Sequence, residues 1–370
     1  MYKKRAVLSA FKKINITILV APLDWGLGHA TRCIPLIRHL LTLNCNVIIA
    51  AEGATEKLLK NEFPFLQFER LPGYNIRYAG RKRFFTLKII QQLPKILFSI
   101  KKEKKWLENL LLTNKINAVI SDNRYGLYNS KIKSVFITHQ LCIKTPFSFL
   151  QKLITLLNYQ LIKKFDACWV PDIKEQPGMA GALSHPGILP GITTTYLGGI
   201  SRFDKTEQNG NKFDFLIVVS GPEPQRTSLE SKLLTQLTDF KGKAMLVRGL
   251  PNSTETLPSN KYLEIKNHLN AAEMEQAFGE SNIIISRSGY TTVMDICKLQ
   301  KKSILIPTPG QTEQEYLAKH LEKQGWCIAA NQQDFDLKEQ LEKAKYFNFR
   351  LPNLKMEFYK QVLNQFIETL

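Results

Sequence analysis

The chain has 370 residues, and its 51 lysines and arginines outnumber 32 acidic residues, which gives a formal net charge of +19. An apolar share of 44% is ordinary for a soluble protein, the length suggests two domains, and no transmembrane helix is predicted. The excess of positive charge indicates an anionic partner, such as nucleic acid, an anionic membrane or a phosphorylated substrate.

The first 23 residues superficially resemble a signal peptide. However, Lys12 and Lys13 interrupt the apolar part, and the apolar run that follows fits a buried strand better. Six cysteines are scattered without a C-x-x-C pair, which is typical of free thiols in a reducing compartment. We therefore expect a cytoplasmic protein.

Apolar runs alternate with segments of helical period along the whole chain. We expect strands at 14–21, 46–50, 117–121, 134–138, 167–170, 214–220, 243–247, 282–286 and 303–307. We expect helices at 30–43, 54–61, 85–110, 148–164, 226–238, 271–278, 290–299, 312–324 and 354–369. Strands that alternate with helices predict parallel sheets in an α/β fold.

One region interrupts this rhythm. Residues 171–213 are rich in Gly, Pro, Ser, Thr and Asn and end in "DKTEQNGNKFD", a composition typical of a linker. After it, "FLIVVSGPEPQRT" starts a new strand, glycine turn and helix. The sequence therefore predicts two doubly wound domains with a cleft between them, and ligands of such sheets bind at the carboxyl ends of strands.

The first candidate site is "DWGLGHATR", between a predicted strand and a predicted helix. Gly26 and Gly28 let the backbone turn sharply and approach a ligand, and His29 would serve either as a general base or as a capping side chain. Asp122 ends another strand, where it would orient His29 or cap its own turn. His139 and Gln140 end a third strand, where they would line an acceptor cleft or, as we favour, bind neighbouring loops.

The second half of the chain contains two further strand–loop–helix turns. In "IIISRSGYTTVMD", the free amides of a helix start predict a phosphate site, and a carboxylate two turns later would accept hydrogen bonds from a ribose diol. In "ILIPTPGQTEQEYLA", a polar cluster opens a helix, and Thr312 with Glu315 also predicts a capping box. Asp334 and Asp336 precede "LKEQLEKA", so we interpret them as helix-capping residues and not as metal ligands.

Residues 81–105 combine nine lysines or arginines with one glutamate, interleaved with large apolar side chains. This pattern predicts an interfacial helix on an anionic membrane, kinked at Pro94, although a core helix with a solvated basic face is the alternative. No DNA- or RNA-binding motif accompanies the charge, so we expect no nucleic acid partner. The residues expected at the membrane are Arg81, Lys82, Arg83, Phe84, Phe85, Lys88, Leu97 and Trp106.

Three motifs together resemble the GT-B glycosyltransferases of family 28. The stretch 283–327 is similar to the nucleotide-sugar signature of that family, "DWGLGHATR" is similar to its glycine-rich loop, and "YLGGISR" is similar to its interdomain segment. The resemblance implies two Rossmann-like domains that face a cleft. We place an acceptor domain at 1–200, a nucleotide-sugar domain at 201–353, and a final helix at 354–370 that packs back on the first domain.

The resemblance also implies roles for residues. His29, with Asp122 as its partner, is the expected base. Asp295 stands where the family usually has the glutamate that contacts the ribose, and Glu313 and Gln314 stand where it has a pair of glutamines facing the sugar. Ser220 lies in a loop that is less glycine-rich than in the family. The implied nucleotide-sugar site comprises Gly28, Arg202, Ser220, Gly221, Arg226, Arg287, Ser288, Gly289, Asp295, Gln311, Glu313 and Gln314.

The function implied by the resemblance is inverting transfer of a sugar, N-acetylglucosamine or similar, from a UDP-sugar to a lipid-linked or glycolipid acceptor. A nucleotide-sugar hydrolase or 2-epimerase with the same fold is the alternative. Helix amides and arginine would meet the phosphate charge, so we expect no metal ion and no cofactor besides the UDP-sugar. The enzyme would lie on the inner face of the cytoplasmic membrane.

Overall fold

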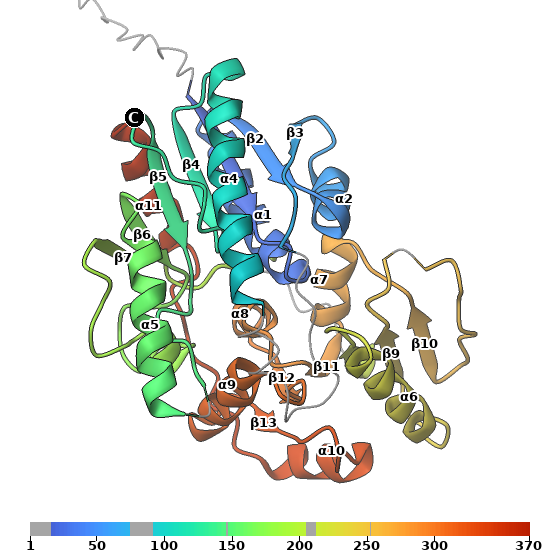
Figure 1. Ribbon diagram of the computed structural model, residues 1–370. Helices are drawn as coiled ribbons and strands as arrows, with labels where there is room; N and C mark the ends of the chain where they lie inside the picture. Colours follow the sequence, from blue (N-terminus) through green and yellow to red (C-terminus); the bar gives the residue numbers. More distant parts are fainter. Residues whose placement is uncertain (1–15, 75–91, 146, 205–211, 252) are drawn as a thin grey trace, which may run out of the picture.

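The computed structural model describes residues 16–74, 92–145, 147–204, 212–251 and 253–370, and its described strands form two separate sheets (Figure 1). All neighbouring strands printed for the two sheets run parallel, and their order in the first sheet is β3-β2-β1-β4-β5-β6-β7. These strands are β1 (Thr17–Pro22), β2 (Asn46–Ala51), β3 (Gln67–Arg70), β4 (Ala118–Asp122), β5 (Lys133–Ile137), β6 (Ala167–Val170) and β7 (Thr193–Tyr196).

The second sheet has the order β10-β9-β8-β11-β12-β13. Its strands are β8 (Phe213–Val218), β9 (Ala244–Val247), β10 (Leu263–Lys266), β11 (Ser281–Ser286), β12 (Lys302–Leu305) and β13 (Ile328–Ala329). In each sheet the chain first builds outward on one side and then crosses to the other, so β1 and β4 flank one switch point and β8 and β11 flank the second. The predicted fold class, α/β with two doubly wound domains, is confirmed.

Helices connect the strands and cover the sheets (Figure 1). In the first domain they are α1 (Leu27–Thr42), α2 (Gly53–Glu62), α4 (Leu93–Thr113), α5 (Ser148–Ile162) and the short η2 (Gly181–Leu183). In the second they are α6 (Gln225–Leu237), α7 (Ala271–Gly279), α8 (Tyr290–Lys298), α9 (Thr312–Lys323) and α10 (Leu337–Tyr346), and α11 (Phe358–Glu368) follows.

The strands that sequence reasoning missed are the four sheet edges, β3, β7, β10 and β13. Three of them, "QFER", "TTTY" and "LEIK", are four residues long and at least half polar, because an edge strand does not need apolar side chains on both faces, and the fourth, "IA", has only two residues. β7 also corrects the predicted linker at 171–213, since part of that region belongs to the first sheet.

Helix α4 begins at Leu93, whereas the part of the predicted helix before residue 92 lies outside the described residues. Pro94 occupies the first turn of α4, where a missing backbone N–H breaks no helical hydrogen bond. Pro94 therefore causes no kink within α4, and the part of the predicted helix on its other side lies outside the described residues. Ile100, Leu107 and Leu110 of α4 are buried against the first domain.

Two predictions about helix capping had opposite outcomes. Asp336 caps α10 by accepting a hydrogen bond from the Glu339 amide at 2.8 Å, as expected. The capping box of Thr312 and Glu315 is wrong, because no side chain caps α9. The Thr312 hydroxyl instead donates to the carbonyl of Lys144 at 3.0 Å, and the Glu315 carboxylate accepts from the amide of Gly310 at 3.1 Å.

The largest buried apolar cluster extends from one domain to the other through α1, α8, α11 and the segment 197–203. Helix α11 lies against α1, where Asn364 and His39 form a hydrogen bond of 2.8 Å. Phe366 meets the Trp169 ring of β6 edge to face. The last helix thus packs on the first domain, while the predicted boundaries at 200 and 353 stay predictions.

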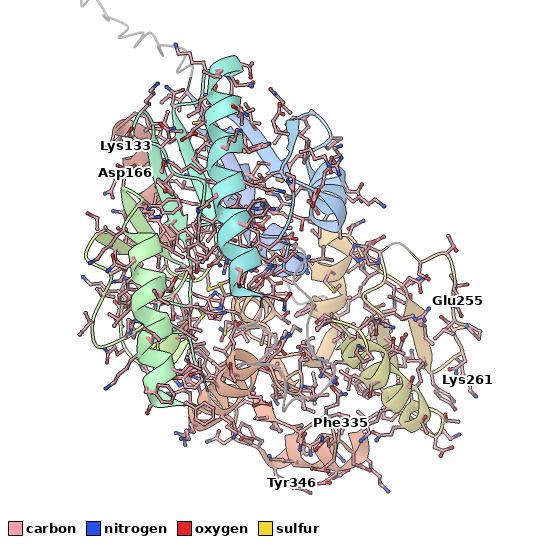
Figure 2. The ribbon with its side chains drawn as sticks, in the orientation of Figure 1. Lys133, Asp166, Glu255, Lys261, Phe335 and Tyr346 are labelled. Atoms are coloured by element: carbon pink, nitrogen blue, oxygen red, sulfur yellow. The ribbon has the colours of Figure 1, made fainter. Side chains whose placement is uncertain are left out.

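Because the strands are parallel, each sheet has one edge of amino ends and one of carboxyl ends. Lys133 and Asp166, at the amino ends of β5 and β6, lie far from the second domain (Figure 2). The carboxyl ends of β4 and β5 point toward the second domain (Figure 1). The loops after the strands are therefore where the two domains meet.

Candidate active site

His29 and Asp122 meet at the switch point of the first sheet. His29 lies in the first turn of α1, after β1, and Asp122 is the last residue of β4, the neighbour of β1. Nδ1 of His29 is 3.2 Å from Oδ1 of Asp122. The Asp122 side chain is fully buried, while 16% of the His29 side chain is exposed. The predicted contact is present, and its catalytic role stays a prediction.

Sequence reasoning missed Arg32, the residue at the centre of this site. It lies one helical turn after His29 and is 1% exposed. Its guanidinium binds both carboxylate oxygens of Asp122, with Nε 3.1 Å from Oδ2 and Nη2 in close contact with Oδ1. Burial opposes ionisation of Asp122, but Arg32 and His29 outweigh it and lower the pKa of that carboxyl to about 2. Asp122 is therefore a permanent anion near neutral pH.

Arg32 also contacts both histidines of the site. Nη2 is 3.0 Å from Nδ1 of His29, and Nη1 is 3.2 Å from Nδ1 of His139. An arginine can only donate hydrogen bonds, so Nδ1 of His139 accepts and Nε2 carries its hydrogen. Burial lowers the pKa of His139 and outweighs the opposing effect of Glu313, which favours the neutral ring near neutral pH.

The network continues into the second domain at Glu313, in the first turn of α9. Nε2 of His139 is 2.7 Å from one oxygen of Glu313, and the amide of Gln140 donates to the other at 2.5 Å. Burial opposes ionisation of Glu313, but His139 outweighs it and holds the pKa of Glu313 below its usual value. His139 also stacks on Tyr290 of α8, with ring centroids 4.3 Å apart. His139 and Gln140 thus bind the opposite domain.

Close backbone approach explains Gly28. Its carbonyl accepts hydrogen bonds from Thr31 at 2.9 Å and, across the domain boundary, from Thr291 at 3.1 Å. A Cβ atom on Gly28 would lie 3.2 Å from the Thr291 hydroxyl. Gly26, just before α1, has a φ of +85°, a conformation that other L-residues rarely adopt.

Arg287 holds together the loops at the carboxyl ends of the second sheet. It is 1% exposed and donates to four backbone carbonyls, those of Ser220, Gln225, Ile306 and Pro307, at 2.9–3.4 Å. No ion pair of Arg287 is found in the described part of the chain. Burial therefore lowers its pKa to about 10, since no anion compensates the charge.

Several polar groups near Arg287 are available to a ligand. Helix α8 has Gly289 as its N-cap residue, and no side chain caps this end. Its first backbone amides therefore have no capping side chain as a hydrogen-bond partner. Gly221, with a φ of +110°, follows Ser220 in the loop after β8. The Thr308 hydroxyl is buried and has no hydrogen-bond partner among the described residues. Ser288 is already occupied, because its hydroxyl donates to the Gln314 carbonyl at 2.8 Å.

Other predicted donor residues already have protein partners. Arg226 forms ion pairs with Glu223 and Glu230 at 2.6 and 2.8 Å, on α6 and the loop before it. Asp295 is 2% exposed, accepts from the Ser201 hydroxyl at 2.6 Å and lies 3.5 Å from Nε of Arg202. Their predicted roles in binding the nucleotide sugar stay predictions.

Of the remaining residues, Arg202 lies in the segment between the two sheets, and Gln311 and Gln314 lie at the start of α9. Arg202 lines a cavity of about 180 Å³ together with parts of α1 and α11. Gln311 is the N-cap residue of α9, and the side chain of Gln314 accepts from the Thr308 amide at 2.9 Å. Gln314 therefore closes the loop from which α9 starts.

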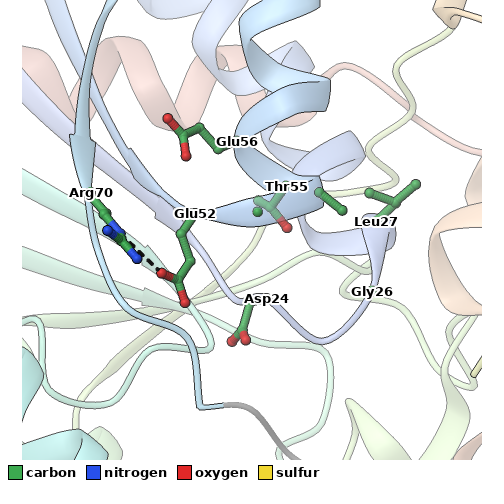
Figure 3. A pocket seen from close by; sticks show the side chains of 9 residues that line it. Asp24, Gly26, Leu27, Glu52, Thr55, Glu56 and Arg70 are labelled. Carbon is green, nitrogen blue, oxygen red and sulfur yellow. Dashed lines mark ion pairs between the residues drawn. The ribbon is translucent and has the colours of Figure 1, made fainter. Parts of the chain in front are cut away.

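A larger cavity, of about 560 Å³, opens at the carboxyl ends of β1, β2 and β3, beside the loop that leads to His29. Its charged lining is Asp24, Glu52, Glu56 and Arg70, and Figure 3 shows the Glu52–Arg70 ion pair of 3.5 Å at one side. Three carboxylates against one guanidinium make this cavity acidic in a strongly basic protein. Its volume lies within the range of small-molecule sites.

The predicted membrane residues are only partly described. Arg81, Lys82, Arg83, Phe84, Phe85 and Lys88 lie outside the described residues. Leu97 is 52% exposed, as a membrane contact requires. Trp106 instead packs against buried residues of the first domain and donates to the Arg70 carbonyl at 3.0 Å. Nowhere in the described residues is a helix both long and apolar enough to cross a bilayer.

Helix α5 presents apolar side chains that sequence reasoning did not single out. Phe149, Leu153, Leu156 and Leu157 are each more than half exposed, and their spacing puts them on one side of the helix. Phe147, just before α5, is 59% exposed. We call these five residues the α5 stripe. Residues 144–164 contain four lysines and no acidic residue, so the charge around the stripe is positive.

Two doubly wound domains whose carboxyl-end loops contact each other define the GT-B class of fold. The crystal structure of MurG from Acinetobacter baumannii has this arrangement, with a TM-score of 0.56 over 96% of this chain and 100% of MurG. The sequence identity is 13%, so the likeness shows the fold alone. In the second domain, residues 249–360 match the model of the glycosyltransferase family 28 C-terminal domain.

Proteins of known name that are similar to this chain are also glycosyltransferases by name. A protein from Caldanaerobacter subterraneus, named UDP-N-acetylglucosamine–N-acetylmuramyl-(pentapeptide) pyrophosphoryl-undecaprenol N-acetylglucosamine transferase, is 29% identical over 38% of this chain. The match spans less than half, 43%, of that relative. A protein of the same name from Clostridium tetani is 23% identical over 93% of this chain and 94% of its own length. The resemblance to family 28 seen in the sequence is confirmed.

Proposed function

We propose that this protein is an inverting glycosyltransferase that moves a hexosyl group, N-acetylglucosamine or similar, from a UDP-sugar to a lipid-linked or glycolipid acceptor. One observation carries the proposal. The histidine–aspartate pair of the first domain is connected, through Arg32 and His139, to Glu313 of the family 28 domain. This contact between the two domains supports a reaction in which His29 acts as the base and the second domain holds the nucleotide sugar.

His29 has the geometry of a general base. With Nδ1–H donating to the ionised Asp122, Nε2 carries a lone pair and takes the proton of an acceptor hydroxyl. The hydroxyl oxygen forms a bond to the anomeric carbon as the bond from that carbon to the UDP oxygen breaks. Attack from the face opposite the leaving group inverts the anomeric configuration, and UDP departs with the electron pair.

The second domain supplies the groups for UDP. The uncapped start of α8, at Gly289, offers backbone amides and the positive end of the helix dipole to the diphosphate. Arg287 adds a positive charge that no protein anion neutralises in the described structure. These groups would meet the charge that develops on UDP, so the proposal needs no metal ion or further cofactor.

The acidic cavity beside His29 would hold part of the acceptor. Asp24, Glu52 and Glu56 accept hydrogen bonds, which suits a group rich in hydroxyls and disfavours a phosphate or carboxylate at this point. The cavity adjoins Gly26 and Leu27, so a sugar placed in it has a hydroxyl within a short distance of the His29 loop. The anionic part of a lipid-linked acceptor would then lie outside this cavity.

A lipid acceptor requires a membrane surface, and the α5 stripe would provide the contact. Apolar side chains surrounded by lysines suit an anionic bilayer. The segment before α5 contacts α9, through the hydrogen bond from Thr312 to Lys144, so the stripe starts beside the donor domain. We place the enzyme peripherally on the inner face of the cytoplasmic membrane. The names of the relatives, which include a pyrophosphoryl-undecaprenol acceptor, support this choice.

Release of UDP, measured with and without a lipid-linked sugar acceptor, tests the function. The purified chain is first screened for thermal stabilisation by nucleotide sugars, because a ligand at 100 times its Kd adds about 2.7 kcal/mol. We expect UDP release to depend on the acceptor and the product to have the opposite anomeric configuration. UDP release at the same rate without acceptor would instead identify a hydrolase or 2-epimerase.

Flotation with vesicles tests the membrane contact. We expect the parent chain to float with anionic vesicles, and a variant with Leu153→Ser, Leu156→Ser and Leu157→Ser to float less, because apolar burial is lost. A control variant carries Phe65→Ser and Leu112→Ser, which are 72% and 83% exposed on other elements. Equal flotation of parent, α5 variant and control would remove the α5 stripe from the proposal.

A further inference from the structure

A second buried ion pair of the first domain, Glu103 with Arg124, has no part in the reaction proposed above. Arg124 lies in the turn after β4, two residues beyond Asp122, and is fully buried. Its Nη1 is 3.0 Å from Oε1 of Glu103, a residue of α4 that is 2% exposed. Buried ion pairs seldom stabilise a fold more than apolar side chains of the same volume, because both charges lose their water. The pair therefore points to a requirement for position.

Arg124 binds the end of the strand that leads into the glycine-rich loop. Its Nε donates to the carbonyl of Pro22, the last residue of β1, at 2.9 Å. Its own carbonyl accepts from the Ser121 hydroxyl at 2.6 Å, which fixes the turn to β4. Between these contacts, the Leu23 amide donates to the Asp122 carbonyl at 3.0 Å. Arg124 thus holds the carboxyl ends of β1 and β4 at one separation.

Glu103 fixes the other side of this arrangement. Its Oε2 accepts from the Tyr74 hydroxyl at 2.8 Å and from the Gly126 amide at 2.9 Å. Nη1 of Arg124 also donates to the Pro72 carbonyl, in the loop after β3, at 3.1 Å. A Cβ atom on Gly126 would lie 2.5 Å from the Cβ of Glu103, so α4 packs directly on the turn. The loops after β3 and β4 therefore converge with α4 on the pair.

We propose that Arg124 is a positioning residue, held by Glu103, that sets the place of Asp122 relative to the loop of His29. No hydrogen bond joins the side chain of Arg124 or Glu103 to that of His29 or Asp122 in the described structure, so the pair acts through the backbone of Pro22 and of its own turn. The consequence for catalysis rests on the proposed function. The placement of the strand ends is a property of the protein without substrate.

Amide hydrogen exchange, resolved by NMR, tests the placement without turnover. The reporter is the Leu23 amide, and the reference is the Thr138 amide, which donates to the Trp169 carbonyl at 3.0 Å in the same sheet. The first variant is Arg124→Lys, because lysine keeps a charge for Glu103 but its one nitrogen cannot stand at both Nε and Nη1. We expect exchange at Leu23 to become roughly tenfold faster or more relative to Thr138.

A second variant removes the pair without leaving a buried charge. Glu103→Gln with Arg124→Met keeps an oxygen for Tyr74 and Gly126, and neither substituted side chain is charged, so the fold is retained. It should speed exchange at Leu23 as Arg124→Lys does. If the lysine variant does not fold, this double variant decides.

The control variant changes a different ion pair on the same helix. Lys104→Met with Glu108→Gln removes a contact of 3.6 Å between two side chains that are each more than a third exposed. We expect the ratio of exchange rates, Leu23 to Thr138, to stay as in the parent. Faster exchange at Leu23 in this control would overturn the inference, because any change on α4 would then disturb the strand ends.

The remaining outcomes separate the inference from the proposed function. An unchanged exchange ratio in a folded variant without Arg124 overturns the inference. A faster ratio in a protein that turns over no nucleotide sugar supports the placement and defeats the proposed function. In an active protein, we expect Arg124→Lys to lower kcat by roughly tenfold or more and to change the KM of the nucleotide sugar by less than about twofold, since the sugar nucleotide belongs to the other domain. An unchanged kcat there would overturn the positioning role.

Discussion

The carboxyl ends of the two sheets differ in whether their buried cations have a counter-charge. At the first sheet, the buried charge of Arg32 is compensated by the carboxylate of Asp122, and the Glu313 carboxylate accepts a hydrogen bond from the His139 ring. At the second sheet, Arg287 meets only backbone carbonyls in the described structure, and α8 begins uncapped. A compensated cluster can hold and direct a proton, whereas an uncompensated cation and free amides are suited to an incoming anion.

The pKa values show the same contrast. Paired charges outweigh burial at Asp122 and lower its pKa to about 2, which stabilises the ionised form. Burial lowers the pKa of Arg287 to about 10, which disfavours its ionised form. A phosphate near Arg287 would supply the missing counter-charge. The carboxyl end of the first sheet is thus suited to acid–base chemistry, and that of the second sheet is suited to binding an anion.

The sharpest way to break this comparison is to remove the base. We expect His29→Ala to lower transfer by roughly 10²–10⁴-fold, the usual contribution of general acid–base catalysis, while UDP binding is kept because it belongs to the other domain. Initial rates with a lipid-linked acceptor and calorimetric titration with UDP measure the two parts. Unchanged transfer would make His29 structural, and weaker UDP binding would contradict the separation of the two ends.

The next largest effect concerns charge compensation. We expect Asp122→Ala to lower the free energy of unfolding by about 3–5 kcal/mol, because it leaves the buried Arg32 without its carboxylate. Urea unfolding measures this loss. The matched control is Asp166→Ala, an exposed aspartate at the amino ends that binds the Ser134 amide at 2.7 Å, where we expect about 1 kcal/mol. Similar losses in the two variants would show that Arg32 does not depend on Asp122.

The sequence predicted the parts of the fold that burial dictates. Central strands such as β1 and β11 contain uninterrupted apolar runs because both faces are covered, whereas the edge strands are short, and three of the four are at least half polar. The contact between His29 and Asp122 was also predictable. Asp122 ends one strand and His29 follows another, and the order of a doubly wound sheet brings the ends of β1 and β4 together.

Long-range contacts set the parts that were missed. Arg32 resembles any cation on a helix, and only the positions of β4 and β5 bury it between Asp122 and His139. Its spacing of three residues from His29 was the one available signal. The apolar face of α5 that is exposed in the structure could not be distinguished in the sequence from a face that packs on the core. Apolar periodicity alone does not show which face of a helix is buried.

Acid should weaken the compensated end, and the sign follows from the pKa shifts. His139 has a lowered pKa, so below its ordinary 6.5 the unfolded chain binds the proton more readily and stability falls with falling pH. Glu313 and Asp122, also lowered, stabilise the fold above their ordinary pKa values and lose this effect below about 4.5 and 3.8. We expect the free energy of unfolding to decline in two steps on acidification.

Substituting His139→Gln sharpens this prediction. The amide still donates to Glu313 and accepts from Arg32, but it does not titrate. We expect the loss of stability just below pH 6.5 to disappear, while the loss below about 4.5 remains. Urea unfolding at a series of pH values measures both steps. Persistence of the first step in His139→Gln would assign it to another group, such as His268, whose pKa burial also lowers.

The smallest expected effect lies at the boundary between the two ends. Gly28→Ala adds a methyl group 3.2 Å from the Thr291 hydroxyl, so Thr291 must move by a few tenths of an ångström. The added Ala also favours α1, by roughly 1 kcal/mol relative to Gly, because it loses less backbone entropy on folding. We expect the two terms nearly to cancel, with a net change in the free energy of unfolding below about 1 kcal/mol.

In a Thr291→Ala background the contact is absent, and the same substitution should stabilise the protein. A double-mutant cycle in urea isolates the difference. No coupling between the two positions would mean that the loop of His29 and the start of α8 are not in contact in solution, and the comparison between the two ends would then describe two separate sites.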